Sequence, residues 1–122
     1  MKRDMDLIRT LLITIEGANA PIEATRLTLP EYDQQSILYH VVLLSEADLI
    51  KAEISYADNY DLPLMAQVER LTWQGHEFLD AARNDSVWQK AKDTVLSKAG
   101  TVSIAVFQAV LISIAKSQLN LQ

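Results

Sequence analysis

The sequence predicts a mostly helical α+β fold of the winged-helix-like class, and three successive stretches carry this prediction. Residues 39–50 form an apolar helix-like run, residues 49–72 have the pattern of two strands around a turn, and a further helix begins at Leu71-Thr72-Trp73-Gln74-Gly75. A helix, a two-stranded wing and a helix that leaves the wing, in this order, are typical of winged-helix domains. We therefore expect a single domain over residues 1–122, with a winged-helix-like core over 1–72 and a C-terminal helical extension over 73–122.

The composition is that of a globular protein with an acidic balance. The chain has 122 residues, of which 49% are hydrophobic, no cysteine, and a formal net charge of −5. The lack of cysteine excludes a disulfide framework and a thiolate zinc site, and it is consistent with a reducing cytoplasm. Residues 1–6 carry acids where a signal peptide would need its apolar segment, so we expect no secretion signal and a cytoplasmic location. The first fifty residues carry a charge of −4 and the remainder −1, with no basic block.

The first helix is predicted over residues 4–16. Asp4 can cap its start, Gly17 suits the position just past its end, and its apolar residues recur at helical spacing. The apolar stripe consists of Met5, Ile8, Leu11, Leu12 and Ile15. Residues 22–29 contain β-branched residues in partial alternation, so we expect a short strand before Pro30.

The second helix, over about residues 33–47, is the one that a winged-helix domain would place in a DNA groove. Asp33 is a natural N-cap residue. The stripe expected to face the core consists of Ile37, His40, Val41, Leu44 and Ala47. The opposite face carries Leu38, Tyr39, Val42, Ser45 and Glu46. A groove-reading face needs Arg, Lys, Asn, Gln or Ser for bases and phosphates, yet no Lys or Arg occurs between Asp33 and Ile50.

The wing is predicted over about residues 49–72, as two strands joined by a turn at 58–63. Asp58 and Asp61 lie in this turn without any cation, so a phosphate backbone would repel the wing tip. The basic residues at the base of the wing are Lys51 and Arg70.

Three further helices are expected after the wing. They cover about residues 73–84, 86–99 and 101–119. Thr72 can cap the first of them, and Gly100 ends the second. The third has no charge between Lys98 and Lys116 and is apolar nearly all round, which indicates a helix buried on several sides. It is shorter than the ~20 predominantly apolar residues that a membrane span needs, so we expect no membrane span.

Several of these stretches resemble an uncharacterised bacterial family. They are Met1 to Arg9, Tyr39 to Ile50, Arg70 to Asp85, and Val87-Trp88. Together they are similar to the domain of unknown function 2513 family, whose members are small and often found in prophages and other mobile elements. The likeness covers about residues 1–92, and its most specific string is Leu-Thr-Trp-x-Gly-His-x-Phe-Leu. The family usually has Glu-Ala-Gly-Leu-Ile before the wing, so here Asp48 must make the left-handed turn in place of glycine. The resemblance implies a winged-helix-like fold and a bacterial or phage setting, and it brings no known activity.

No catalytic residue, metal site or cofactor is expected. The two histidines, His40 and His76, lack metal-ligand spacing, and we interpret both as structural. There is no Gly-x-Ser-x-Gly elbow, and the three glycines cannot build a phosphate-binding loop. Trp73 and Trp88 each lie near a helix start, where core packing is the expected role.

Two classes of function remain open at this stage. The first is a protein-interaction or accessory module that forms a homodimer, because the helix over 101–119 needs a cover on several sides. Its expected interface residues are Leu38, Tyr39, Val42, Phe107, Val110, Leu111 and Ile114. The alternative is a winged-helix DNA-binding transcriptional regulator, which the acidic charge disfavours. Its expected DNA contacts are Gln34, Gln35, Ser36, Lys51 and Arg70, with the basic pair on phosphate and the amides on base edges.

Overall fold

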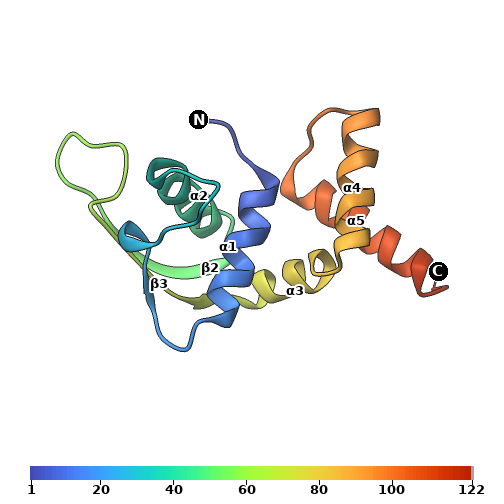
Figure 1. The fold of residues 1–122 in the computed structure, drawn as a ribbon, viewed down its shortest axis with the longest axis horizontal. Coiled ribbons are helices and arrows are strands. Elements are labelled where there is room, and N and C mark those ends of the chain that lie inside the picture. The colour runs from blue at the N-terminus through green and yellow to red at the C-terminus, as the bar shows by residue number, and fades with distance from the viewer. Residues whose placement is uncertain (122) are drawn as a thin grey trace. The chain divides into compact units, whose positions relative to one another are not determined.

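A computed structural model describes residues 1–121 as an α+β fold, with five α-helices, one 3-10 helix and a three-stranded antiparallel sheet (Figure 1). The chain divides into two compact units, Met1–His76 and Glu77–Gln122. The sheet belongs to the first unit, and helices α4 and α5 belong to the second. The division falls inside helix α3, close to the end of the winged-helix-like core expected from the sequence.

Helix α1 (Met5–Gly17) begins at Asp4, as expected. The side chain of Asp4 accepts hydrogen bonds from the amides of Asp6 and Leu7 at 2.9 and 3.2 Å. These bonds satisfy two of the amides that a helix start leaves without partners. The expected apolar stripe is confirmed except at its first member, because Met5 is only partly buried and Leu7 takes its place in the core.

The strand predicted over residues 22–29 is wrong beyond its first two residues. Strand β1 is only Ile22–Glu23, after which the chain turns into a 3-10 helix, η1 (Ala24–Arg26). The carboxylate of Glu23 accepts hydrogen bonds from the amide and the hydroxyl of Thr25 at 3.0 and 2.8 Å. A side-chain acceptor two residues earlier in the chain stabilises a turn, and here this effect outweighs the strand preference of the β-branched residues.

The same carboxylate of Glu23 also ties this turn to the sheet, because it accepts the amide of Ala66 on the neighbouring strand at 3.1 Å. Burial acts to raise the pKa of Glu23, but the hydrogen bonds from Thr25 and Ala66 and the charge of Arg26 outweigh it. The pKa of Glu23 therefore lies below its ordinary value of 4.5.

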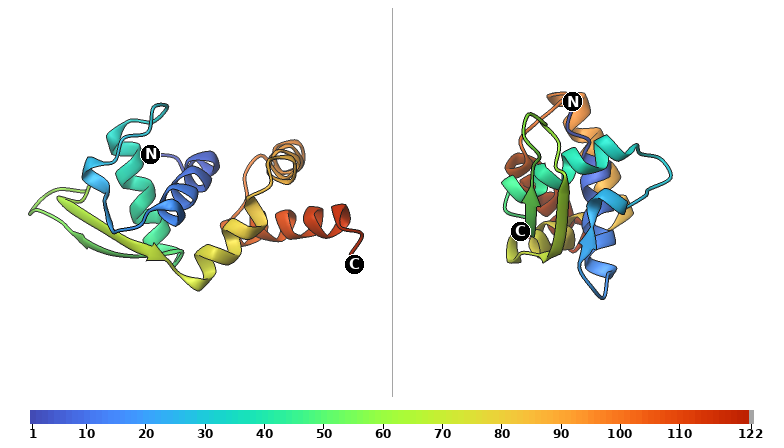
Figure 2. Two further views of the ribbon diagram at one scale, coloured as in Figure 1. Left: turned by 60° about the horizontal axis from the view of Figure 1, so that its bottom comes forward. Right: turned by 90° about the vertical axis from the view of Figure 1, so that its left-hand side faces the viewer.

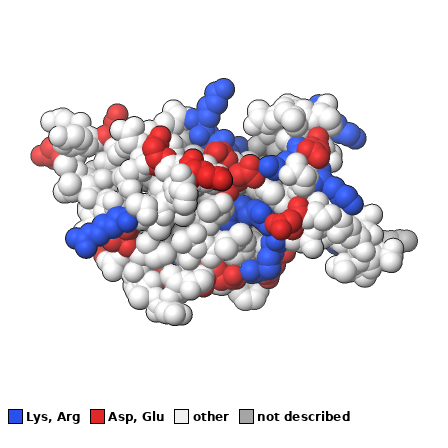
Figure 3. All heavy atoms as spheres, in the orientation of Figure 1, with Lys and Arg blue, Asp and Glu red and all other residues white. Residues whose placement is uncertain are grey.

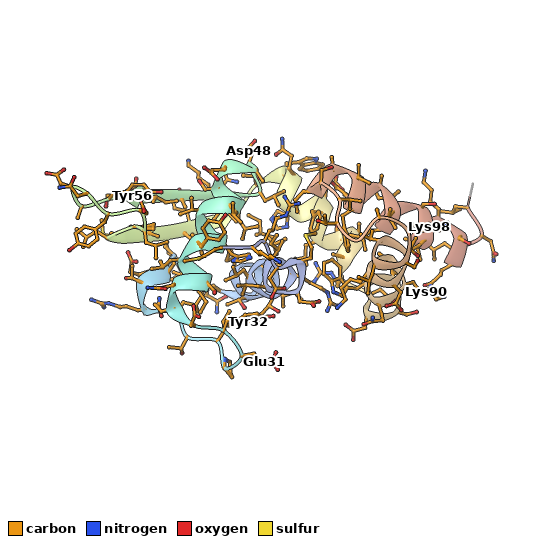
Figure 4. All side chains as sticks on the ribbon, turned by 90° about the horizontal axis from the view of Figure 1, so that it is seen from above. Glu31, Tyr32, Asp48, Tyr56, Lys90 and Lys98 are labelled. Atoms are coloured by element: carbon orange, nitrogen blue, oxygen red, sulfur yellow. The ribbon has the colours of Figure 1, made fainter. Side chains whose placement is uncertain are left out.

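Helix α2 (Gln34–Glu46) is capped by Asp33, which accepts the Ser36 amide at 2.7 Å. At its other end Asp48 has a φ of 60°, as the sequence predicts for this position (labelled in Figure 4). The amide of the following residue, Leu49, donates to a carbonyl of the last turn of α2, the hydrogen bond of a Schellman-type helix end. Glycine is the usual residue in this conformation, and aspartate tolerates it better than most.

The sheet has the strand order β1-β3-β2, so β3 (Met65–Leu71) is central. Strands β2 (Ile50–Ser55) and β3 form the expected hairpin, in which Ile50 pairs with Leu71 and the register shifts after Lys51. The buried face of the hairpin carries Ile50, Ala66, Val68 and Leu71. Helices α1 and α2 both lie on one side of this hairpin (Figure 2), which leaves its other face to solvent.

A joint around Thr72 fixes the start of helix α3 (Trp73–Ala82). The hydroxyl of Thr72 accepts the amide of Gly75 at 3.1 Å and donates to the carbonyl of Asp48 at 2.6 Å. The amide of Thr72 donates to the carbonyl of Leu49 at 3.0 Å. Gly75 lies directly against that same Leu49 carbonyl, in a space where a Cβ atom would collide with the oxygen. The start of α3 is therefore held against the turn that ends α2.

The second unit is helical. Helix α4 (Asp85–Lys98) begins slightly earlier than expected, because Asn84 caps it by accepting the Val87 amide at 3.0 Å. Helix α5 (Ile104–Gln118) follows a turn in which Gly100 has a φ of 76°. Trp88 of α4 packs against the ring of an α5 phenylalanine, with ring centroids 5.0 Å apart. Within residues 1–121, no helix is long and apolar enough to cross a membrane.

Replacement of Gly75 by alanine should lower the free energy of unfolding by about 2 kcal/mol, because the added Cβ must displace the Leu49 carbonyl. A glycine-to-alanine change in an unobstructed helix does the opposite and stabilises it, by up to about 1 kcal/mol. Gly17, at the end of α1, has open space around its Cα and provides the matched control. Urea unfolding of Gly75→Ala and Gly17→Ala measures both, and equal midpoints for the two variants would contradict the steric explanation.

Replacement of Glu23 by glutamine should destabilise the fold by about 1–2 kcal/mol at neutral pH, because three donors lose a charged acceptor. The pKa of Glu23 is lowered in the folded state, so its contribution is complete above the unfolded value of 4.5 and is lost as the pH falls through the folded value. The stability difference between wild type and Glu23→Gln should therefore shrink in acid. Urea midpoints between pH 3 and pH 7 measure it, with Glu53→Gln on the exposed face of β2 as the control for the loss of one charge. A difference that stays constant with pH would contradict this role.

Candidate functional site

The two units differ in charge. Residues 1–76 contain six Lys and Arg against twelve Asp and Glu, whereas residues 77–122 contain five against four. The negative charge of the chain is thus concentrated in the unit that holds the sheet. Burial, and then the negative charges of Asp4, Asp6 and Glu31, raise the pKa of the Tyr32 phenol (Figure 4).

His40 is a structural residue, as the sequence interpretation holds. It is buried on α2, and its Nε2 accepts the backbone amide of Asp4 at 2.7 Å while its Nδ1 lies 2.8 Å from the carbonyl of Ser36. The neutral imidazole with hydrogen on Nδ1 satisfies both contacts. His40 therefore ties the start of α1 to α2. His76 is exposed on α3, and residues 1–121 contain no group of three or more His, Asp and Glu side chains placed to hold a metal ion.

The interface expected on α2 is smaller than the sequence suggests. Leu38 was expected on the outer face but is only 7% exposed, so it belongs to the core. Tyr39 and Val42 are partly exposed, and Tyr39 contacts His40 edge to face with ring centroids 5.6 Å apart. Ala47, expected on the core stripe, is exposed instead because the helix ends before it. Helical spacing alone misjudges these positions by about one residue at each edge of the stripe.

Two of the expected DNA contacts on α2 are already engaged within the fold. The side-chain amide of Gln34 donates to the carbonyl of Ala24 at 2.8 Å, which fixes η1 to α2. The amide and the hydroxyl of Ser36 bond to Asp33, and these bonds hold the pKa of Asp33 below its ordinary range. Gln35 is exposed.

The two basic residues that the sequence predicts at the base of a wing lie side by side. Lys51 and Arg70 are cross-strand partners in the β2–β3 hairpin, and both are exposed. The ammonium group of Lys51 lies 3.8 Å from a carboxylate oxygen of Glu69. A guanidinium nitrogen of Arg70 donates to the carbonyl of Leu71 at 3.0 Å. The structure thus brings the expected pair together and places an acid near Lys51.

Residues 56–65, which join β2 to β3 and which the sequence predicts as the tip of a wing, carry exposed apolar side chains that the sequence did not single out. Tyr56, Tyr60, Leu64 and Met65 are all exposed, and the largest exposures are 72% for Tyr60 and 69% for Leu64. Asp58 and Asp61 lie between them in the chain, and acidic side chains are visible at the outer end of the loop (Figure 3). The sequence feature that indicates this exposed surface is the presence of large apolar residues within a stretch that otherwise has the composition of a turn.

The interface expected on the last helix is corrected in part. Phe107 and Leu111 are buried in the second unit, where the Trp88 ring covers Phe107, so neither is available to a partner. Val110 and Ile114 are partly exposed. The exposed apolar residues of α5 are instead Ala105, Val106, Ala109 and Ile112. The uncharged helix is therefore covered along one stripe and open along the other.

A groove of about 480 Å³ lies between α3 and α5 in the second unit. Ile112, Ala115 and Leu119 give it an apolar wall, while Glu77 of α3 and Lys116 of α5 stand among its lining residues. Ligand sites for small molecules usually combine an apolar pocket with several convergent polar groups. This groove has a mixed polar border instead, and it extends the open apolar surface of α5.

The two tryptophans differ from one another. Trp88 is buried, as expected for core packing, whereas Trp73 is 76% exposed. The expected core role of Trp73 is therefore wrong, and the reason is local: Gly75, two residues later, is the member of this turn that faces the Leu49 carbonyl. Residues on opposite sides of one helical turn cannot both face the core.

Comparison with known proteins places these features in a family without an assigned activity. Residues 2–101 match the family described as "Hypothetical protein (DUF2513)", which extends the likeness beyond residue 92, where the sequence resemblance ended. An "Uncharacterized protein" of Haemophilus influenzae is 40% identical over 114 residues, which cover 90% of this chain and 92% of that protein. No solved structure matches the chain. The chain therefore belongs to the domain of unknown function 2513 family.

Proposed function

We propose that the chain is a winged-helix-like protein-interaction module of bacterial or prophage origin, which acts in the cytoplasm and catalyses no reaction. The order of elements in residues 1–76 supports the winged-helix-like assignment. It runs helix, strand, short helix, helix, strand, wing, strand, and the 3-10 turn η1 occupies the place of the short helix. The strand order β1-β3-β2, with the wing hairpin at one edge, agrees with this assignment. A fold of this kind does not by itself assign DNA binding.

The observation that carries the choice of protein over DNA is the charge of the surface that would face a groove. Helix α2 contains no Lys or Arg, and the unit that holds it has twice as many acids as basic residues. Non-specific DNA affinity depends on the number of phosphates that a protein neutralises, and this surface offers few positive charges to neutralise them. Exposed apolar side chains at the wing tip and on α5 support protein binding instead, because exposed apolar surface often marks a protein interface.

Helix α5 is the proposed homodimer contact. Its exposed stripe alternates small residues, such as Ala105 and Ala109, with the larger Val106 and Ile112. Small residues allow a second helix to approach closely, and the larger ones supply apolar area. No charge of either sign lies between Lys98 and Lys116, so two copies of this stripe would not repel one another.

One observation favours the alternative of a DNA-binding transcriptional regulator. Lys51 and Arg70 stand next to each other on the exposed face of the hairpin, and Gln35 is exposed at the start of α2. A dimer could add basic residues from two N-terminal segments to such a pair. This alternative therefore predicts that Lys51 and Arg70 contact DNA phosphates, which can be measured.

The chain should show no binding to random-sequence duplex DNA, even at low salt, when fluorescence anisotropy is followed at low and at near-physiological ionic strength. The physical reason is the excess of acids in the unit that would face the duplex. Salt-sensitive binding that disappears in Lys51→Ala/Arg70→Ala would establish the regulator in place of the interaction module. Lys90→Ala/Lys92→Ala on α4 is the charge-matched control.

The chain should have twice the mass of its 13.7 kDa monomer in light scattering at micromolar concentration. Val106→Glu should shift the mass to that of a monomer, because it places a charge in the exposed stripe of α5. Val106 is exposed, so the substitution leaves the core of the unit intact. Ile13→Glu changes a similarly exposed apolar residue on α1 and should leave the dimer unchanged. A monomeric wild type would rule out the dimer.

A further inference from the structure

The tip of the wing is an apolar surface with nothing to cover it in the first unit. Four large side chains are exposed within residues 56–65, namely Tyr56, Tyr60, Leu64 and Met65. The connection between β2 and β3 extends past the ends of the strands (Figure 1), and Tyr56, which directly follows β2, lies where this connection begins (Figure 4). Single exposed apolar residues are ordinary, and neighbours such as Leu64 and Met65 face opposite sides of the hairpin, but four large exposed side chains within ten residues concentrate apolar surface at this end of it.

Backbone hydrogen bonds shape the loop that carries these side chains. The amide of Leu64 donates to the carbonyl of Ser55 at 2.9 Å and closes the hairpin. Within the loop, the amide of Tyr60 donates to the carbonyl of Ala57 at 3.3 Å, and Asn59 takes the left-handed conformation with a φ of 66°. Pro63, within the loop, is buried. These features fix part of the loop backbone before a partner arrives, which lowers the entropy cost of binding.

The charge around this patch has one sign. From Ala52 to Glu69 the hairpin contains four acids and no Lys or Arg. Two of the acids, Asp58 and Asp61, are exposed in the loop beside the tyrosines. The cations nearest in the sheet, Lys51 and Arg70, lie at the other end of the hairpin. An incoming group must therefore satisfy exposed carboxylates as well as cover aromatic rings.

A guanidinium group meets both requirements. It stacks on the face of an aromatic ring and forms paired hydrogen bonds with a carboxylate, whereas an ammonium group is a more strongly hydrated point charge. An apolar partner without cations would leave both aspartates facing apolar surface, which is costly. We propose that the wing tip binds an arginine-bearing segment of a partner protein. This inference rests on the protein-interaction function and names the chemistry of its partner.

The probe is a short blocked peptide that alternates arginine and alanine, titrated into the isotope-labelled full-length chain and followed by amide chemical shifts. Shift changes should be confined to residues 56–65, and the lysine counterpart of the peptide should bind more weakly. Tyr56→Ser/Tyr60→Ser should weaken arginine-peptide binding about tenfold, because two exposed cation–π contacts are lost. Asp58→Asn/Asp61→Asn should weaken it as well. Both pairs are exposed, so the spectra outside the loop should stay unchanged.

Matched controls separate the patch from general acidity. Glu31→Gln removes an exposed acid outside the wing, and Trp73→Ser removes an exposed aromatic ring outside it, so neither should change the affinity. Shift changes spread over all acidic surfaces, or full affinity in Tyr56→Ser/Tyr60→Ser, would overturn the proposal. A self-association that depends on Tyr60 would replace the arginine-bearing partner by a second copy of the chain. If DNA does not bind and the arginine peptide does not either, only this inference fails; salt-sensitive DNA binding removes the proposed function itself.

Discussion

The first unit depends on the contact between Gly75 and the backbone of Leu49. The two segments can touch because Gly75 has no side chain, and the hydroxyl of Thr72 bridges the same place by accepting from Gly75 and donating to Asp48. One joint therefore fixes the end of α2, the start of the hairpin and the start of α3. The threonine and the glycine of the Leu71-Thr72-Trp73-Gln74-Gly75 stretch are therefore fold determinants in this chain, whereas its tryptophan is exposed.

Three of the twelve acids in the first unit accept backbone hydrogen bonds that stabilise helix starts and a turn. Asp4 and Asp33 cap helices, and Glu23 collects three donors from η1 and β3. Carboxylates suit these places because they accept several amide hydrogen bonds and favour the positive end of a helix dipole. The acidic balance is thus partly structural. Acids that do not stabilise the backbone in this way are available for binding. Asp58 and Asp61 at the wing tip are exposed examples.

In the first unit, an α+β framework with an excess of acids separates the architecture from the choice of ligand. The helix and the hairpin supply a rigid frame, and the side chains on that frame decide what can approach it. Here the framework presents a helix without Lys or Arg, an exposed Lys51–Arg70 pair with Glu69 near Lys51, and exposed tyrosines and aspartates between β2 and β3. The helix and the loop offer little attraction for phosphate, and the exposed tyrosines support the proposed protein partner. The exposed stripe of α5 is further apolar surface, in the other unit.

Local chemistry in the sequence predicted the helices, their approximate limits and the β2–β3 hairpin, and the resemblance predicted the family and the left-handed turn at Asp48. Caps, apolar spacing and turn residues act over a few neighbouring positions, so a single chain read in order contains them. The tertiary structure alone decided the rest. It tied Glu23, whose local turn with Thr25 ends strand β1, to Ala66 of β3. It also placed Leu38 in the core, exposed Trp73 because Gly75 faces the Leu49 carbonyl, and covered Phe107 with Trp88. Ala66, Leu49 and Trp88 lie far along the chain from the residues that they affect, and periodicity carries no information about such partners.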